Sequence, residues 1–150
     1  MKPFVFRLQT ALDLRLKEEE MLKEKLCRAT EDYKKRLKAL EELRVRLTEI
    51  QDVIRGKSRR DIDVSEIVRY EDFIPVLAGR IETQKAAVEE SRQEMERIRH
   101  DLVETMKDRK VLEKLRTGHY QEYVKESLRE EQKQIDEMAT TGYVHKDSVM

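Results

Sequence analysis

Carboxylate clusters are the groups in this chain whose type and spacing could carry out acid–base chemistry. Examples are Glu18-Glu19-Glu20 and Glu130-Glu131. A carboxylate serves as a general acid or base near neutral pH only when burial or a neighbouring charge shifts its pKa, and nothing in the surrounding residues indicates burial. No serine or cysteine lies in a recognisable nucleophile context. We therefore predict that the chain has no catalytic residues and is not an enzyme.

Phosphate-binding and metal-binding patterns are equally weak. Gly56-Lys57-Ser58 lacks the upstream glycine and the strand context of a phosphate-binding loop. Cys27 is the single cysteine, and His100, His119 and His145 are far apart in the sequence, so no ligand set has metal-binding spacing. We expect no metal and no cofactor. A single cysteine also excludes an internal disulfide, which fits a reducing compartment.

The charge of the chain is balanced, because 32 basic and 32 acidic residues are interleaved along it. A nucleic-acid-binding protein would present a one-sided basic surface, and only Lys57, Arg59 and Arg60 cluster. The longest apolar stretch, residues 73–79, contains a proline and is too short to span a bilayer. Arg7 interrupts the apolar start of the chain, unlike in a signal peptide. We expect a cytoplasmic protein that binds no nucleic acid and does not insert into membranes.

A long amphipathic helix must organise these residues. A spacing that averages 3.5 residues keeps one face of a slightly supercoiled helix against a partner, as in a coiled coil. The composition agrees, with 43% charged residues, four glycines and two prolines. Intrinsic disorder is the alternative for so polar a chain, and the regular spacing argues against it for residues 4–138. The positions of this seam in the first part of the chain are Leu8, Leu12, Arg15, Glu19, Leu22, Leu26, Ala29, Tyr33, Arg36, Leu40, Leu43, Leu47, Ile50 and Ile54.

Residues that begin and end helices divide the chain into two arms. Pro3 suits a first helical turn, Gly56 suits a helix C-terminus, and Asp63-Val64-Ser65-Glu66 has capping-box spacing. We predict a first helix over about 3–55, a polar turn over 56–63, and a second helix over about 64–139 with a kink near Pro75. Residues 140–150 are expected to form a flexible tail. The seam resumes in the second arm at Leu77, Ile81, Gln84, Val88, Ser91, Met95, Ile98 and Leu102.

The predicted fold class is therefore all-α, a long antiparallel two-helix coiled coil, or αα-hairpin, over residues 1–139. At about 1.5 Å per residue the arms would be roughly 80 Å and 110 Å long. The second helix would then overhang after about Gly118, and this end is either a docking surface or a solvated, frayed helix end. A second open choice concerns the apolar cluster Tyr70, Phe73, Ile74 and Leu77, which is either core packing where the arms meet or a partner-binding patch.

Three segments, taken together in their order and spacing, resemble one protein family. Residues 4–15, FVFRLQTALDLR, resemble the N-terminus of the bacterial flagellar export protein FliJ. Residues 70–77, YEDFIPVL, followed by Ile81, resemble the family's Tyr-x-x-Phe element, although Pro75 departs from its pattern. Residues 131–139, EQKQIDEMA, resemble its C-terminal Gln-Lys signature. The resemblance covers nearly the whole chain.

The resemblance implies a component of the flagellar type III export apparatus without enzymatic activity of its own. Members of this family form a two-helix coiled coil that sits in the pore of the export ATPase hexamer, promotes its assembly and activity, and links it to the cytoplasmic domain of the export gate membrane protein. The family has also been assigned a role in recycling export chaperones. By the same resemblance we expect a monomer in isolation, located in the cytoplasm at the inner face of the cell membrane at the flagellar base.

The resemblance also implies two sets of partner-binding residues. The first set is apolar and would contact the export gate; the family has aromatic residues at two of its positions on the first helix, where this chain has Leu43 and Leu47. The second set lies near the two chain ends and would contact the ATPase ring. The gate set is Leu40, Leu43, Leu47, Phe73 and Leu77, and the ring set is Phe6, Leu8, Leu12, Gln132, Ile135, Asp136 and Glu137.

Two other functions remain compatible with the residues. A self-associating structural coiled coil would use Arg15, Glu19 and Arg36 in the seam to set its register. A chaperone-like holder of export clients would use exposed apolar ends. The residues do not distinguish a flagellar protein from its equivalent in a virulence-type secretion system, and they identify neither the substrates served nor the direction of insertion into the ring.

Overall fold

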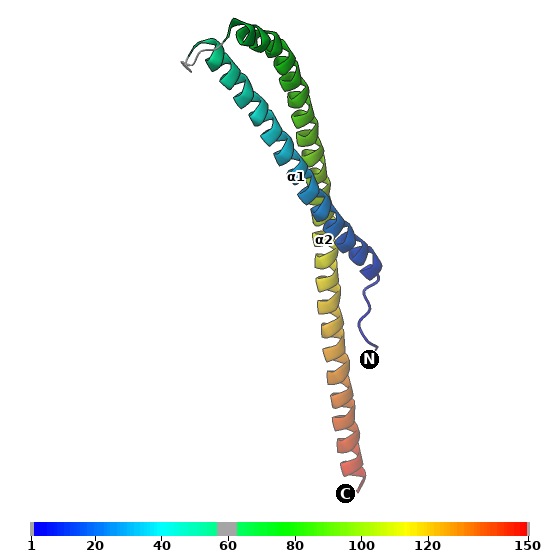
Figure 1. Cartoon of the computed structure of the whole chain (residues 1–150). Coiled ribbons are helices and arrows are strands. Elements are labelled where there is room, and N and C mark those ends of the chain that lie inside the picture. The colour runs from blue at the N-terminus through cyan, green and yellow to red at the C-terminus, as the bar shows by residue number, and fades with distance from the viewer. Residues whose placement is uncertain (1, 57–62, 150) are drawn as a thin grey trace. The chain divides into compact units, whose positions relative to one another are not determined.

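The chain consists of two helices in a computed structural model that describes residues 2–56 and 63–149. Helix α1 spans Gln9–Ile54 and helix α2 spans Val64–Val149, and the described residues contain no strand. The two helices pack against each other in antiparallel order (Figure 1). The predicted all-α helical hairpin is confirmed. The predicted turn over 56–63 lies almost wholly outside the described residues.

The start of α1 differs from the prediction, which began the helix at about residue 3. Residues 2–6 have no regular secondary structure, and the first backbone bond of the helix region runs from the Gln9 N–H to the Phe6 carbonyl at 3.1 Å. The physical reason is the side chains of Phe4 and Phe6. In an extended segment residues two apart point to the same side, which lets both rings pack on α2 while Val5 stays 80% exposed.

The facing ends of the helices are built as the sequence indicates. Gly56 has a φ of 74°, a left-handed conformation that an L residue rarely adopts, and its N–H bonds the Val53 carbonyl at 3.1 Å. At the start of α2 the Asp63 carbonyl accepts the first helical hydrogen bond from the Glu66 N–H at 3.0 Å. The Asp63 carboxylate accepts a 2.8 Å hydrogen bond from the Ser65 hydroxyl.

The chain divides into two compact units, which we describe separately. The hairpin unit is Glu20–Val103, and the terminal unit is Met1–Glu19 with Glu104–Met150. In both units the predicted seam is the contact between the helices. Every first-arm seam residue from Leu12 to Ile54 is buried or half-buried, as is every second-arm seam residue from Leu77 to Leu102.

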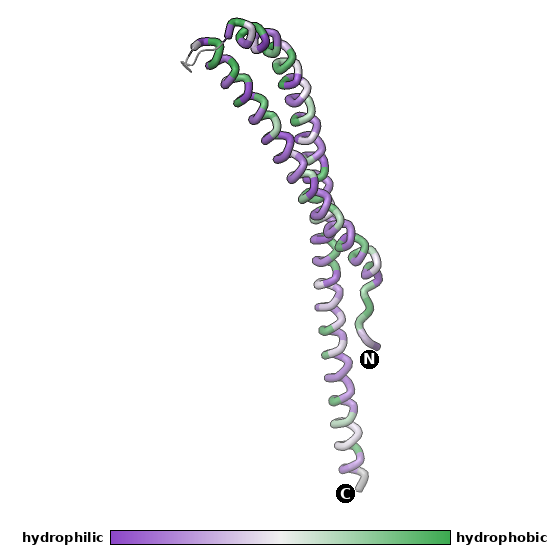
Figure 2. Tube along the Cα trace, in the orientation of Figure 1, coloured by the Kyte–Doolittle hydropathy of each residue, from purple (hydrophilic) through white to green (hydrophobic). Residues whose placement is uncertain are grey.

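The apolar core of the hairpin unit lies where α1 ends and α2 begins. Its buried centre is Leu40, Ile50, Leu77 and Ile81, and its half-buried surround is Leu43, Leu47, Ile54, Tyr70, Phe73, Ile74 and Val88. The aromatic side chains therefore widen the apolar contact between the two helices in this part of the hairpin unit. Figure 2 shows how sparsely apolar residues are distributed among polar ones along the rest of both helices.

Two polar seam residues of the hairpin unit bond directly to the opposite backbone. The Arg36 guanidinium donates to the Ala87 carbonyl at 2.9 Å, and the Gln84 amide donates to the Arg36 carbonyl at 2.9 Å. Arg36 also contacts the Asp32 carboxylate at 3.1 Å. Removing a polar group from water without giving it a hydrogen-bond partner is destabilising. These reciprocal bonds therefore favour this alignment of α1 against α2.

Helix α2 continues across Pro75 and to Val149 without a break. Proline removes the bond to the carbonyl four residues earlier and bends a helix, and Figure 1 shows α2 curving within its first turns. At the other end, the helix continues about ten residues beyond the predicted end at residue 139. Residues 140–147 remain exposed on this last part of the helix, and the helical bonds of Thr140 and its neighbours are supplemented by the Thr140 hydroxyl, which donates to the Asp136 carbonyl at 2.8 Å.

The buried centre of the hairpin unit generates a stability prediction. Leu77 is only 1% exposed, so Leu77→Ala should lower the free energy of unfolding by about 3 kcal/mol through lost burial and a residual cavity. Val76→Ala is the matched control, because Val76 is 50% exposed, and it should change stability by less than about 0.5 kcal/mol. Urea unfolding followed by circular dichroism measures both. Equal effects of the two substitutions would show that Leu77 is not in the core.

Candidate partner-binding surfaces

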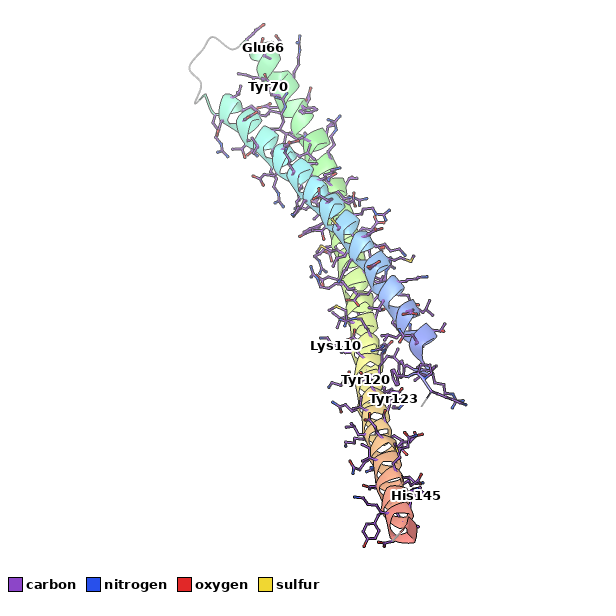
Figure 3. The ribbon with its side chains drawn as sticks, turned by 90° about the horizontal axis from the view of Figure 1, so that it is seen from below. Glu66, Tyr70, Lys110, Tyr120, Tyr123 and His145 are labelled. Carbon is purple, nitrogen blue, oxygen red and sulfur yellow. The ribbon has the colours of Figure 1, made fainter. Side chains whose placement is uncertain are left out.

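An aromatic cluster fastens the N-terminal segment to α2 in the terminal unit. Phe4 lies edge-on to Tyr120 and tilted to Tyr123, with ring centroids 5.2 Å and 5.5 Å apart, and Phe6 lies edge-on to His119 at 5.6 Å. These separations are typical of favourable aromatic pairs. Figure 3 shows Tyr120 and Tyr123 on the part of α2 beside this segment. We call these five residues the aromatic clasp.

Polar contacts hold the same segment in place. The Tyr123 hydroxyl donates a 2.7 Å hydrogen bond to the Lys2 carbonyl. The Arg116 guanidinium lies 5.7 Å from the centroid of the Phe4 ring, and its Nε donates to the Gln9 Oε1 at 3.0 Å. A cation over an aromatic face is attracted by the ring's quadrupole. The N-terminal segment is thus part of the packed structure of the terminal unit.

A nearly buried ion cluster lies further along the terminal unit. Arg109 Nε lies 2.5 Å from the Glu19 carboxylate, and Arg109 Nη1 contacts the Glu113 carboxylate at 2.9 Å. The Glu19 side chain is only 7% exposed and the Arg109 side chain 17%. The hydrogen bonds from Arg109 to Glu113, together with the nearby Glu19 carboxylate, raise the pKa of Arg109 above its ordinary value although desolvation opposes this. The seam therefore carries a charged pair here in place of an apolar one.

The predicted gate set divides into buried and accessible residues. Leu40 and Leu77 are 5% and 1% exposed and belong to the core of the hairpin unit. Leu43, Leu47 and Phe73 are half-buried. A shallow groove is lined by Ala39, Glu42, Leu43, Arg46, Phe73, Leu77 and Arg80. The Arg80 guanidinium lies 5.6 Å from the centroid of the Phe73 ring at this groove, so the apolar groove has a basic rim.

The predicted ring set also divides. Phe6 and Leu12 are 5% and 4% exposed and pack inside the terminal unit. Leu8 and Ile135 are 40% and 55% exposed. The polar members on the last part of α2, which are Gln132, Asp136 and Glu137, are also exposed. Direct contact with a partner is thus open to five of the seven residues.

The last part of α2 carries an apolar row with no cover among the described residues. Leu128, Ile135 and Met138 are 59%, 55% and 73% exposed, and they are spaced seven and three residues apart. This spacing places them on one face of the helix. Residues 131–147, which we call the α2 arm, are exposed throughout. The arm begins later than the predicted overhang at Gly118, because the aromatic clasp covers part of residues 119–123.

Neither a metal site nor a membrane-spanning helix is found among the described residues. In the part of the chain that the structure describes, no group of histidine, cysteine and carboxylate side chains is arranged to hold a metal ion. No described helix has an apolar stretch long enough to cross a bilayer.

The aromatic clasp and the Arg109 ion cluster were not predicted from the sequence. A signal for the clasp was present, because Phe4, Phe6, Tyr120 and Tyr123 are four of only eight phenylalanines and tyrosines and lie at positions that an antiparallel hairpin brings together. The predicted helix from residue 3 would not place Phe4 and Phe6, two residues apart, on the same face. For Glu19 the seam position was identified, but the sequence does not name its partner.

The aromatic clasp generates a second prediction. Phe6→Ala should detach the N-terminal segment, at a local cost of about 3 kcal/mol because the Phe6 ring is nearly fully buried. Limited trypsin digestion should then cleave after Arg7 faster than in the unchanged chain. Val5→Ala is the control, since Val5 is 80% exposed, and it should leave the cleavage rate unchanged. Equal rates for both variants would exclude a packed N-terminal segment.

Comparisons with known proteins give one match. The family model described as flagellar FliJ protein matches residues 4–148. No curated protein and no solved structure matches the chain significantly. The family is a component of the flagellar export apparatus, and the helical hairpin of the described residues fits the coiled coil expected from the resemblance. Since the match covers nearly the whole chain, the chain belongs to the flagellar FliJ protein family.

Proposed function

We propose that this chain is the non-catalytic stalk of the flagellar type III export apparatus. It inserts into the export ATPase hexamer, promotes the assembly and activity of the ring, and links the ring to the cytoplasmic domain of the export gate protein. The observation that carries the proposal is the α2 arm, an exposed amphipathic helix end in a chain whose family match spans residues 4–148. The protein works in the cytoplasm, peripherally at the membrane of the flagellar base.

The last part of α2 supports docking because its apolar row is exposed, with Ile135 and Met138 in the α2 arm and Leu128 just before it. Leu128, Ile135 and Met138 would lie against apolar surface of the ring, and Gln132, Asp136 and Glu137 would make polar contacts around them. Helices commonly bind partners by placing such a row into a groove. Leu8, which is 40% exposed, adds a contact from the terminal unit.

Stimulation of the ring must then work through binding alone. The chain needs no cofactor, since the nucleotide belongs to the ATPase. Contact with the stalk can raise the rate of hydrolysis only if it favours one conformation of the ring subunits over another, by binding that conformation more tightly. A stiff pair of helices suits this role because the helices do not bend to fit both conformations of the ring equally well.

The gate contact is best served by the groove of the hairpin unit. Half-buried Leu43 and Phe73 line this groove together with buried Leu77. Leu40 and Leu47 do not line it and belong to the same apolar cluster. Arg46 and Arg80 on its rim would favour an acidic partner surface. A role in recycling export chaperones belongs to the same proposal, with the α2 arm as the surface available for it.

The ring contact is tested by stimulation of the purified cognate export ATPase. Ile135→Glu places a charge in the apolar row, so about tenfold more protein should be needed for half-maximal stimulation. Val111→Glu is the control, because Val111 on the same helix is 59% exposed and Ile135 is 55% exposed. The unchanged chain should saturate near one copy per hexamer.

Two results would contradict this function. One is the absence of both stimulation and co-sedimentation with the hexamer. The other is a dimer of the isolated chain in light scattering, which would favour a self-associating coiled coil. A chaperone-like holder would instead be indicated by suppressed aggregation of a model client at equimolar ratio.

The gate contact is tested by binding to the cytoplasmic domain of the gate protein in calorimetry. Phe73→Ala should weaken binding about tenfold, because it removes the aromatic wall of the groove. Val76→Ala, three residues away and 50% exposed, should bind like the unchanged chain. Helix content from circular dichroism must be retained in both variants, since a loss in Phe73→Ala would assign the residue to the core alone.

A further inference from the structure

A second groove in the terminal unit is not used by the proposed ring and gate contacts. The extended N-terminal segment forms one wall, and the face of α2 beside the aromatic clasp forms the other. Apolar surface predominates in the lining, and the groove is open along the helix. Its lining residues are Lys2, Pro3, Phe4, Val5, His119, Glu122, Tyr123, Glu126 and Glu130.

The acidic side of this groove is a regular row of carboxylates. Glu122, Glu126 and Glu130 are four residues apart, so they follow one side of the helix at intervals of about 6 Å. All three are exposed. A helix that carries lysine or arginine at the same interval would match them one to one.

These carboxylates are also free of the ion pairs that their spacing would allow. Bases follow them three residues later, at Lys125, Arg129 and Lys133. Further upstream, each acid between residues 82 and 107 that has a base three residues on forms an ion pair with it. Those pairs are Glu82–Lys85, Glu89–Arg92, Glu94–Arg97, Glu96–Arg99 and Glu104–Lys107. Within the described residues, Glu122, Glu126 and Glu130 form none.

The apolar side of the groove supplies the remaining contact area. Phe4 is held firmly, because it packs against Tyr120 and Tyr123 and under the Arg116 guanidinium. Val5 projects from the segment at 80% exposure, an apolar side chain left uncovered beside the acidic row. A rigid apolar wall next to a line of carboxylates fits a ligand that is apolar on one side and basic on the other.

We propose that this groove binds a basic amphipathic helix of a partner protein. The helix would place lysine or arginine residues, spaced by four, against Glu122, Glu126 and Glu130, and its apolar residues against Phe4 and Val5. A second copy of this chain fits poorly, because residues 121–138 contain six acidic and three basic residues and would repel their own kind. The proposal rests on the groove alone and does not require insertion into the ATPase ring.

A direct binding experiment with the full chain tests this. The probe is a designed helical peptide with leucine on one face, lysine at every fourth position beside it, and a tryptophan, since the chain itself has none. The lysine peptide should bind at low salt and at least about tenfold more weakly at 0.5 M salt. The same peptide with glutamate in place of lysine should not bind. Equal binding of both peptides would overturn the proposal and leave only non-specific apolar association.

Substitutions then locate the site. The triple variant Glu122→Gln, Glu126→Gln and Glu130→Gln should lose about tenfold in affinity for the lysine peptide, since each exposed pair contributes modestly. Its control has the same change of net charge on exposed acids of the hairpin unit, namely Glu31→Gln, Glu41→Gln and Glu49→Gln. If both triple variants lost the same affinity for the lysine peptide, the effect would be due to net charge alone, and the groove would be rejected as the binding site.

A third variant tests the Val5 side of the groove without disturbing the clasp. Val5→Lys puts a positive charge on the rim at a residue that is 80% exposed, so the fold should be retained. It should weaken the lysine peptide several-fold and leave ATPase stimulation unchanged. Unchanged peptide affinity would contradict the assigned groove. Because the peptide experiment contains no ATPase, its failure is distinguishable from failure of the stalk function.

Discussion

A pair of helices can bury only one narrow face of each helix, and the rest of this structure follows from that constraint. A seam one side chain wide removes little apolar surface from water, so each polar residue within it needs its own partner. The Arg36 guanidinium and the Gln84 amide bond reciprocally to backbone carbonyls, and Glu19 pairs with Arg109. These contacts favour one alignment of the helices, because sliding would separate the paired groups, whereas an all-leucine seam would permit several alignments. Buried polar groups of this kind are best known for setting register.

The same constraint explains the aromatic residues. A thin seam is weakest where a helix begins or ends, because the last turns have neighbours on one side only. The chain places Tyr70 and Phe73 at the start of α2, and the aromatic clasp joins Phe4 and Phe6 at the start of the chain to α2. Large rings bury much area per residue, so a few of them close each end. The packed but non-helical residues 2–6 thereby cover part of α2 in place of further turns of α1.

The candidate contact surfaces lie where the aromatic residues no longer cover the helices. The groove of the hairpin unit lies beside half-buried Phe73, the α2 arm begins after the N-terminal segment has ended, and the acidic groove runs beside Val5. Each combines a supported apolar wall with charges whose sign selects a partner. The contacts that we propose for this member of the flagellar FliJ family depend on partly covered apolar residues that the packed helices hold at defined positions.

The sequence by itself determined the two long helices, the seam and the helix ends at Gly56 and Asp63, because these depend on periodicity and on local backbone preference. The family resemblance predicted the gate and ring sets, but not which of their members are accessible. Only the tertiary structure decided that Leu40, Leu77, Phe6 and Leu12 are buried. It likewise decided that Phe4 and Phe6 pack from an extended segment and that Glu19 meets Arg109. Contacts between residues about a hundred positions apart depend on the alignment of the helices, and local pattern carries no information about which distant side chain completes a pair.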